Sequence, residues 1–426
     1  MTFASTDMSI RFIIILSIIL LAEYYSFIAV RGALRTMQPV WRISLTALYV
    51  AFTLMAWGGL VLFRAINWAE VPHLLRNIYI AMVLGFTVGK ILVMLVMLID
   101  DIRRLITWMI ASLAFRNPAP GTSPADQSMT IDRSVFMRQA ALVLGGLSLV
   151  GFTAGITNRY RYRVRKIKLS FASLPDAFKG LRIVQISDIH TGSFDDHRAV
   201  EHGIERILHQ EADIILFTGD LVNNVADEID DRFKAIYSRL KAPMGVYSTL
   251  GNHDYGDYVP WASAQEKRAN LEKLKGIHAE VGWRLLMNEH VVLERGNEKI
   301  ALVGIENWSA KANFPKYGNM GKAYEGLPEK NIPFKILLSH DPSHWRGEVL
   351  NSYKDVSLML SGHTHGMQFG VDSKWLKWSP VQYVYDEWAG LYRDGDQCLY
   401  VNRGFGFLGY PGRLGVLPEI TVIELA

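Results

Sequence analysis

Five short polar segments in the second half of the 426-residue chain bring together carboxylates, imidazoles and one amide. They are Asp188-Ile189-His190, Gly219-Asp220, Gly251-Asn252-His253-Asp254, Ser339-His340-Asp341 and Gly362-His363-Thr364-His365. Oxygen and imidazole donors without a thiolate suit Mn, Fe or Zn better than a soft metal. We therefore expect these segments to bind divalent metal ions.

The donor set is large enough for two cations. Cations held about 3.5–4 Å apart need a shared carboxylate, and Asp220 is the expected bridge. One metal would be completed by Asp188, His190 and His365, and the other by Asn252, His340 and His363. A water bridging the metals would become a hydroxide that attacks phosphorus in line.

His253 follows Asn252 but is not needed as a ligand, so it is the expected general acid for the leaving oxygen. Gly219, Gly251 and Gly362 would allow the tight turns that bring the backbone close to metal and phosphate. The sequence therefore assigns catalysis to His253 and metal binding to the seven other side chains.

Apolar stretches typical of buried strands precede the polar segments, and helical periodicity lies between the first of them. Asp188, Asp220 and Asn252 are 32 residues apart in succession, a length that suits βαβ units. These features predict an α/β sheet whose carboxyl edge carries the site. The expected strands are 181–187, 212–218, 245–250, 290–296, 299–305, 333–339, 355–360, 398–402 and 419–425, and the expected helices are 196–210 and 228–240.

With these motifs the sequence resembles the calcineurin-like metallophosphoesterases, whose pattern is D-x-H, GD, GNH[DE], H and GHxH. The resemblance covers about 180–426, and no ligand position is substituted. It implies a four-layer α/β/β/α sandwich with a binuclear metal site that hydrolyses phosphoric esters.

Further segments are similar to the bacterial membrane-associated branch near the YkuE- and YaeI-like phosphodiesterases: GNHDYG (251–256), GHTHGMQ (362–368), YVNRGFG (400–406) and PGRLGVLPEI (411–420). This similarity implies action on phosphodiester or pyrophosphate bonds of glycolipids. The residues after Asp220 include Asn223 and Asn224 where some phosphatases place an acid, so the partner of His253 stays unassigned.

The first half of the chain is apolar. Stretches 12–30, 43–63 and 78–99 are long enough to cross a bilayer, which takes about 20 helical residues. We expect transmembrane helices in 1–115, including an interfacial helix at 105–115. A linker at 116–138, a fourth membrane helix at 139–157 and a basic juxtamembrane collar at 158–180 follow, before the catalytic domain of 181–426.

Charge is distributed unevenly. The collar has six bases between Arg159 and Lys168, whereas 169–426 has 27 basic and 34 acidic residues. An acidic domain binds the phosphate backbone poorly, so nucleic acid is not an expected partner. The single Cys398 excludes a disulfide framework and a cysteine-based metal site.

The positive charges near the predicted spans support opposite orientations of the chain in the membrane, depending on whether the collar is counted. With an external amino terminus, the inner loops carry eight arginines and the outer segments three, but the collar adds six bases outside. Long domains cross the membrane largely regardless of charge. We expect a multi-pass protein of the inner or plasma membrane with its catalytic domain on the extracytoplasmic face.

We therefore expect a membrane-anchored dimetal phosphoesterase acting on a lipid-linked substrate, a glycolipid or phospholipid. One alternative is a general or nucleotide phosphodiesterase for which the membrane part is a simple anchor. The other is a non-enzymatic membrane sensor with a vestigial metal domain. Two further features stay open: Arg403 and Arg413 would either grip a phosphate or be ordinary arginines, and the aromatic stretch 375–388 would form core, line a pocket or rest on the bilayer.

Overall fold

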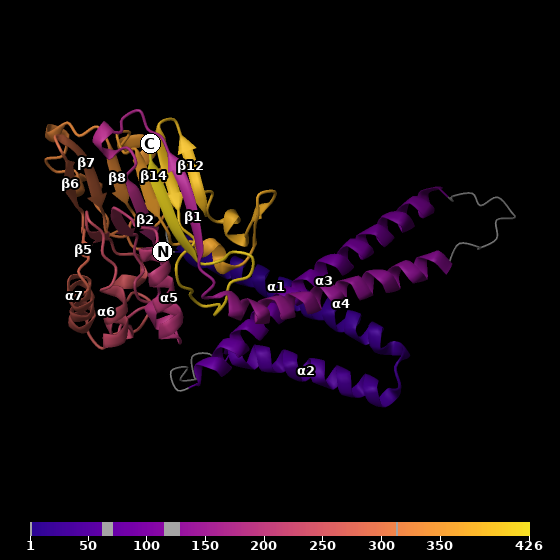
Figure 1. Ribbon diagram of the computed structural model, residues 1–426. Helices are drawn as coiled ribbons and strands as arrows, with labels where there is room; N and C mark the ends of the chain where they lie inside the picture. Colours follow the sequence, from indigo (N-terminus) through magenta and orange to yellow (C-terminus); the bar gives the residue numbers. More distant parts are fainter. Residues whose placement is uncertain (1, 62–70, 115–127, 312–313) are drawn as a thin grey trace. The chain divides into compact units, whose positions relative to one another are not determined.

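The computed structural model describes residues 2–61, 71–114, 128–311 and 314–426. The chain divides into two compact units, Met1–Ala154 and Gly155–Ala426. The described part of the first unit is helical, and all described strands belong to the second unit (Figure 1).

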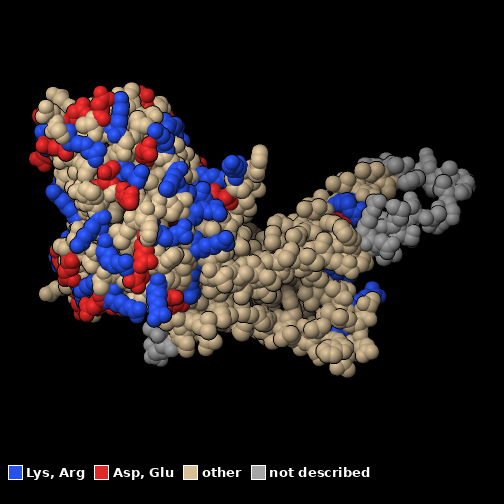
Figure 2. Space-filling model, in the orientation of Figure 1, with Lys and Arg blue, Asp and Glu red and all other residues tan. Residues whose placement is uncertain are grey.

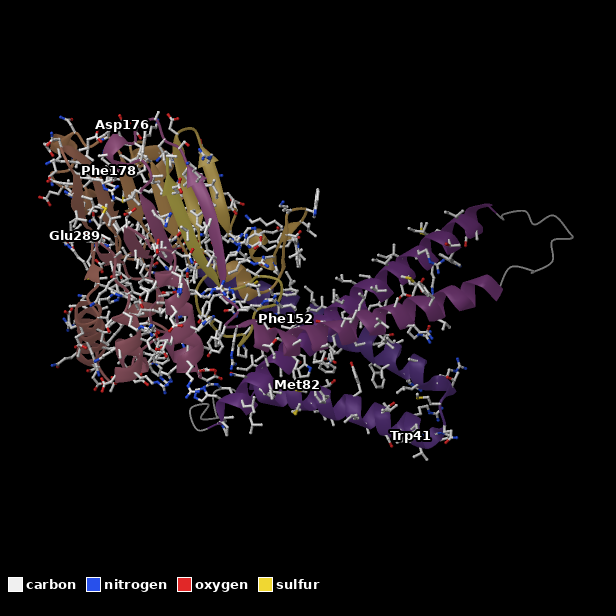
Figure 3. The ribbon with its side chains drawn as sticks, in the orientation of Figure 1. Trp41, Met82, Phe152, Asp176, Phe178 and Glu289 are labelled. Atoms are coloured by element: carbon white, nitrogen blue, oxygen red, sulfur yellow. The ribbon has the colours of Figure 1, made fainter. Side chains whose placement is uncertain are left out.

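The described residues of the first unit form four long helices: α1 (Thr2–Ala33), α2 (Pro39–Val61), α3 (His73–Ala114) and α4 (Ser128–Gly155). Four stretches that coincide with these helices or run a turn past them are long and apolar enough to cross a membrane: Ile13–Thr36, Pro39–Gly59, His73–Ser112 and Val135–Asn158. Figure 2 shows that the surface of these helices is almost free of charge, and Trp41 is exposed near the start of α2 (Figure 3). An uncharged, outward-facing apolar surface is typical of helices in lipid, and the chain is accordingly a membrane protein.

Polar and small residues connect these helices inside the unit. Lys90 of α3 lies 2.5 Å and 2.7 Å from the two carboxylate oxygens of Glu23 on α1, and Trp57 of α2 donates to the same carboxylate. Ionisable residues within membrane helices face the bundle interior and pair with one another. Gly89 of α3 approaches the backbone of Gly145 on α4 so closely that a Cβ on Gly89 would collide with it, and a Cβ on Gly145 would collide with Val93.

Two boundaries in this unit differ from the sequence prediction. Residues 105–114 continue α3 instead of forming a separate interfacial helix. No Pro or Gly interrupts the chain there, and Asp100 pairs with Arg103 and Arg104 one turn later, at 2.9 Å each. Helix α4 begins at Ser128, so 128–138 of the predicted linker are helical, while 116–127 lie outside the described residues.

The second unit contains two six-stranded sheets. In the first, the order is β1 (Arg163–Leu169), β14 (Glu419–Leu425), β2 (Arg182–Ile186), β3 (Ile214–Phe217), β4 (Val246–Ser248) and β5 (Arg284–Leu285). In the second, it is β12 (Gly390–Asp394), β13 (Gln397–Val401), β9 (Leu358–Ser361), β8 (Lys335–Leu338), β7 (Glu298–Gly304) and β6 (Glu289–Arg295). Strands β2 to β5 are parallel, as are β7, β8, β9 and β13.

Three apolar cores separate four layers. Helices α5 (His197–Leu208), α6 (Asp231–Tyr237) and α7 (Ala264–Glu280) pack on the outer face of the first sheet. The inner faces of the sheets meet in a second core that includes Phe178, labelled in Figure 3. Helix α8 (Met320–Ala323) and the turn Trp345–Val349 cover the second sheet. Parallel strands covered on both faces read as continuous apolar stretches, and the predicted α/β/β/α sandwich is confirmed.

Strand β1 was not expected from the sequence, which predicted a collar over 158–180. Residues 163–169 pair with β14 along their whole length and form the edge of the first sheet. An edge strand tolerates charge on its exposed side chains, and Arg165 and Lys168 pair with Glu419 and Glu424 of the neighbouring strand. The basic stretch is therefore part of the catalytic unit.

Candidate metal centre

All eight predicted site residues follow the carboxyl ends of strands. Asp188 and His190 follow β2, Asp220 follows β3, and Asn252 and His253 follow β4 of the first sheet. The second sheet adds three imidazoles, with His340 after β8 and His363 and His365 after β9. Because the carboxyl ends of parallel strands share an edge, the site lies where the edges of both sheets meet.

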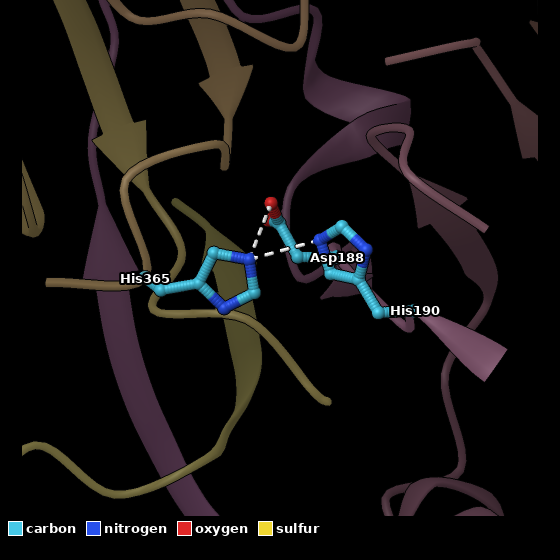
Figure 4. A group of neighbouring side chains, drawn as sticks. All are labelled: Asp188, His190 and His365. Atoms are coloured by element: carbon cyan, nitrogen blue, oxygen red, sulfur yellow. Dashed lines mark hydrogen bonds and ion pairs between the residues drawn. The ribbon is translucent and has the colours of Figure 1, made fainter. Parts of the chain in front are cut away.

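The first group consists of Asp188, His190 and His365, all buried (Figure 4). His365 Nε2 lies 3.2 Å from Asp188 Oδ1 and 3.1 Å from His190 Nε2. Three donor atoms that point at a common centre could hold one cation.

The second group consists of Asp220, His340 and His363, and Asn252 joins it. His363 Nδ1 lies 2.8 Å from Asn252 Oδ1 and 3.3 Å from His340 Nε2. Asp220 Oδ2 is 3.1 Å from His340 Nε2 and 3.5 Å from His190 Nε2, so this carboxylate lies between the two groups. That position suits the bridging role expected from the sequence.

Backbone conformation supports a specialised site. Left-handed φ angles occur at Asp188 (52°), His190 (51°), Asp220 (61°), His363 (70°) and His365 (50°). Residues with a side chain adopt this region at a cost of order 1–3 kcal/mol, and such strain clusters at functional sites. A Cβ on Gly251 or Gly362 would collide with the carboxylates of Asp220 and Asp188, which confirms that the chain needs glycine at these turns.

The protonation states of the predicted ligand side chains are compatible with bound cations. Burial lowers the pKa of His190 well below its usual range, so its ring is neutral, and His190 Nδ1 is buried without a partner among the described residues. Burial raises the pKa of the Asp220 carboxyl, but His340 and His253 outweigh it and hold that pKa well below normal. Burial likewise opposes charge on His340, yet Asp220 raises its pKa to about 10. Buried carboxylates that draw positive charge to themselves suit bound metal.

One nitrogen of His340 and one of His363 face the centre, because the other nitrogen of each ring has a partner outside it. His340 Nδ1 donates to the carbonyl of Thr218 at 2.7 Å, so Nε2, which the raised pKa keeps protonated beside Asp220, is the nitrogen that would bind a metal after losing its proton. His363 Nε2 lies 2.8 Å from the Tyr385 hydroxyl, which itself donates to Asp341 at 3.2 Å, and this leaves Nδ1. Sequence reasoning did not assign these orienting contacts to Tyr385 or Asp341.

His253 has a backbone partner. Its Nδ1 donates to the carbonyl oxygen of Asn223 at 2.7 Å, and its amide donates to Asp220 Oδ1 at 2.9 Å. Glu228 fixes the loop that carries this carbonyl by accepting from the amides of Asn223 (2.5 Å), Asn224 (2.8 Å) and Val225 (3.0 Å). The His253 ring is only half-buried, so its other nitrogen can reach a substrate.

Asp254 is a second structural carboxylate that sequence reasoning left without a role. Its oxygens accept from the amides of Gly251 (2.8 Å), Asp220 (2.9 Å), Leu221 (2.8 Å) and Val222 (3.2 Å). One buried side chain thereby ties the loop after β3 to the loop after β4. The sequence signal that could have indicated this role is the position of Asp254 directly after the predicted ligand Asn252 and the predicted general acid His253.

Arg403 and Arg413 are ordinary structural residues. Arg403 pairs with Glu419 at 2.5 Å and with Asp372 at 3.0 Å. Arg413 is fully buried and donates to backbone carbonyls, including that of Arg403 at 2.7 Å. Both side chains are buried and their terminal nitrogens already have protein partners, which argues against the phosphate grip.

A four-layer sandwich with Asp and His side chains gathered where its two sheets meet is the architecture of a metallophosphoesterase. A family model for calcineurin-like phosphoesterases matches residues 181–367, and one for the transmembrane domain of probable calcineurin-like phosphoesterases matches residues 9–159. The chain belongs to the calcineurin-like phosphoesterase family and is a metal-dependent phosphoric ester hydrolase.

Three relatives illustrate the similarity. The uncharacterized metallophosphoesterase YkuE of Bacillus subtilis is 30% identical over 258 residues, which cover 59% of this chain and 81% of that protein. The UDP-2,3-diacylglucosamine pyrophosphatase LpxG of Chlamydia trachomatis is 27% identical over 286 residues, 55% of this chain and 81% of that protein. A transmembrane protein with metallophosphoesterase domain from Danio rerio is 29% identical over 269 residues, 62% of this chain but only 57% of that protein.

Proposed function

We propose that this membrane metallophosphoesterase hydrolyses a phosphodiester or pyrophosphate bond of a lipid-linked substrate. The observation that carries the proposal is the convergence of seven donor side chains beside the half-buried His253, in a chain with four apolar helices. The similarity to LpxG, whose name describes a pyrophosphatase of a diacylated sugar nucleotide, supports this substrate class.

In this proposal Asp188, His190 and His365 would hold one metal, Asn252, His340 and His363 would hold the other, and Asp220 would serve both. The cations, of the Mn, Fe or Zn type, would polarise the phosphoryl oxygens and acidify a water molecule. His253 would give a proton to the leaving oxygen from Nε2, because Nδ1 is bonded to Asn223.

Activity on two substrates tests the proposal. We expect the full chain in nanodiscs with Mn²⁺ to hydrolyse both bis(4-nitrophenyl) phosphate and a lipid-linked pyrophosphate, with a higher kcat/KM for the lipid. Metal binding without turnover of either substrate would refute the enzymatic proposal and favour a sensor.

The alternative of a soluble-substrate phosphodiesterase is supported by the compactness of Gly155–Ala426, which holds all three large cores. Equal kcat/KM on the lipid for the full chain and for 155–426 would favour that alternative. A large loss on the lipid alone favours the proposed function.

We further propose that the catalytic unit lies on the extracytoplasmic face, because the loop arginines favour an external amino terminus. Cys398 is buried, so a cysteine introduced at the exposed Asn297 is the reactive thiol of the folded catalytic unit. Labelling of Asn297→Cys by a membrane-impermeant maleimide in intact cells is expected. Labelling only after lysis would place the unit inside.

A further inference from the structure

An exposed apolar surface lies between the last predicted ligand and β12. We call residues 367–384 the 367–384 surface. Five large apolar side chains are exposed there by half or more: Met367 (53%), Trp375 (95%), Leu376 (55%), Tyr383 (76%) and Val384 (54%). Soluble surfaces rarely gather such residues over so short a segment, and contiguous apolar patches mark interaction sites.

A hairpin, a backbone hydrogen bond and an ion pair fix the position of this surface. Strands β10 (Val371–Asp372) and β11 (Lys377–Trp378) form a hairpin that projects from the domain, orange-yellow in Figure 1, with Trp375 and Leu376 in its turn. The backbone amide of Gly370 donates to Leu414 at 2.9 Å, and Asp372 pairs with Arg403. The apolar side chains are therefore presented outward by a fixed scaffold.

The same segment contacts the metal centre. Tyr385, one residue beyond the surface, lies 2.8 Å from His363 Nε2. Thr364 donates to the carbonyl of Trp388 at 2.6 Å, and the Ser379 hydroxyl donates to the carbonyl of Gly366 at 2.9 Å. A molecule bound on the apolar surface would thus lie beside the ligand loop that follows β9.

Basic side chains border the surface. Lys374 and Lys377 flank Trp375 and Leu376, and Arg165 of the β1 edge forms an ion pair with Asp372 of the hairpin. Figure 2 shows Lys and Arg side chains over this edge of the domain. Exposed Asp386 is the acid that follows the surface. Aromatic and aliphatic side chains framed by lysine are typical of protein segments at the bilayer interface.

We propose that the 367–384 surface docks on the lipid bilayer, with Trp375 and Leu376 in the head-group region, so that the metal centre receives lipid substrates from the membrane. The catalytic unit is tethered to the bilayer, since only the residues between Gly155 and Arg163 separate the apolar helix α4 from β1. Contact of this surface with the bilayer does not depend on catalysis, but the delivery of lipid substrate to the metal centre rests on the proposed function.

Site-specific fluorescence tests the docking. Because Cys398 is buried, an environment-sensitive NBD label can be placed at Leu376→Cys in the full chain, reconstituted in nanodiscs of 3:1 phosphatidylcholine and phosphatidylglycerol. We expect strong quenching by spin-labelled lipid at position 376. A label at Asn297→Cys, in the exposed turn between β6 and β7, is the matched control and should not be quenched. Equal quenching at both positions, or none at 376, would overturn the proposal; a blue-shifted label at 376 without quenching would indicate a protein contact instead.

A rate ratio separates the docking from the proposed function. For Trp375→Ser/Leu376→Ser we expect the ratio of kcat/KM on lipid substrate to kcat/KM on bis(4-nitrophenyl) phosphate to fall about tenfold, whereas Asn297→Ser leaves it unchanged. An unchanged ratio in the double variant would overturn the docking role. A wild-type chain that turns over the soluble ester but no lipid would refute the proposed substrate class, while quenching at 376 would still report docking.

Discussion

His253 owes its orientation to a carbonyl oxygen, not to a carboxylate. The Asn223 carbonyl can only accept, so it fixes Nδ1 as the protonated nitrogen and turns Nε2 toward the centre. A proton on Nε2 is therefore the one that His253 would give to a leaving oxygen.

Replacing His253 should affect poor leaving groups most. For His253→Gln we expect kcat to fall about 10²–10³-fold on an alkyl phosphodiester, within the usual range for a general acid. The loss on bis(4-nitrophenyl) phosphate should be smaller, because nitrophenolate leaves without a proton. Steady-state kinetics on both substrates, with metal content measured in parallel, checks this; equal losses on both would exclude the general-acid role.

Glu228 acts on His253 only through the loop. Glu228→Gln can no longer accept from every amide of 223–225, so we expect about a tenfold loss of kcat with KM and metal content unchanged and the pH profile shifted. Asp227→Asn is the matched control, since Asp227 is exposed and pairs with Lys273 on the surface. A loss of stability without a change in the pH profile would show that Glu228 is merely structural.

Among the elements, the strands with continuous apolar sequences were predicted, whereas a strongly basic strand and the shortest strands were not. Strands β2, β3, β4 and β8 lie within the expected ranges and β9 ends one residue beyond its range, because their buried faces demand apolar residues on both sides. Strand β1 alternates bases with Val and Ile, so its charge suggested a collar. The two-residue strands β5, β10 and β11 are too short to show periodicity and depend on tertiary contacts.

The ion pair between α1 and α3 makes a prediction for the helical unit. Lys90→Met leaves the Glu23 carboxylate without its cation, which should destabilise the unit by about 3 kcal/mol, the scale for breaking a buried pair. The double variant Glu23→Leu/Lys90→Leu should recover most of the loss. Thermal unfolding in detergent measures both; a double variant no more stable than Lys90→Met would contradict the expectation.

Helix α7 carries a buried histidine whose titration affects stability. Burial lowers the pKa of His278 to about 3, whereas an unfolded histidine has a pKa of about 6.5. The unfolded state therefore binds the extra proton below pH 6.5, and this contribution to the free energy of unfolding, complete above pH 6.5, falls by about 1.4 kcal/mol per pH unit as the pH drops toward 3.

Urea unfolding of the metal-free protein between pH 6.5 and 4.5 measures this effect. His278→Gln should flatten the pH dependence, because glutamine takes up no proton. The exposed His202 on α5 provides the control variant His202→Gln, which should leave the slope unchanged. Identical slopes for wild type and His278→Gln would contradict the prediction.

At the scale of the whole molecule, the sequence predicts the metal-ligand side chains better than it predicts the residues that orient them. Seven donor side chains were predicted because their types and order carry the chemistry. The roles of Asp254, Glu228 and Tyr385 were not, because a carboxylate that accepts backbone amides and a hydroxyl that orients an imidazole depend on loop geometry. Such contacts become visible only once both sheets are assembled.

The two-cation centre can be tested most directly by the metal content of the purified full chain, measured by inductively coupled plasma mass spectrometry after loading with Mn²⁺ or Zn²⁺ and removal of free metal. We predict two metal ions per chain for the wild type and clearly fewer for Asp220→Ala, since both groups lose their common carboxylate. A wild-type chain that retains no metal, or an Asp220→Ala variant that keeps two ions, would contradict the shared dimetal centre.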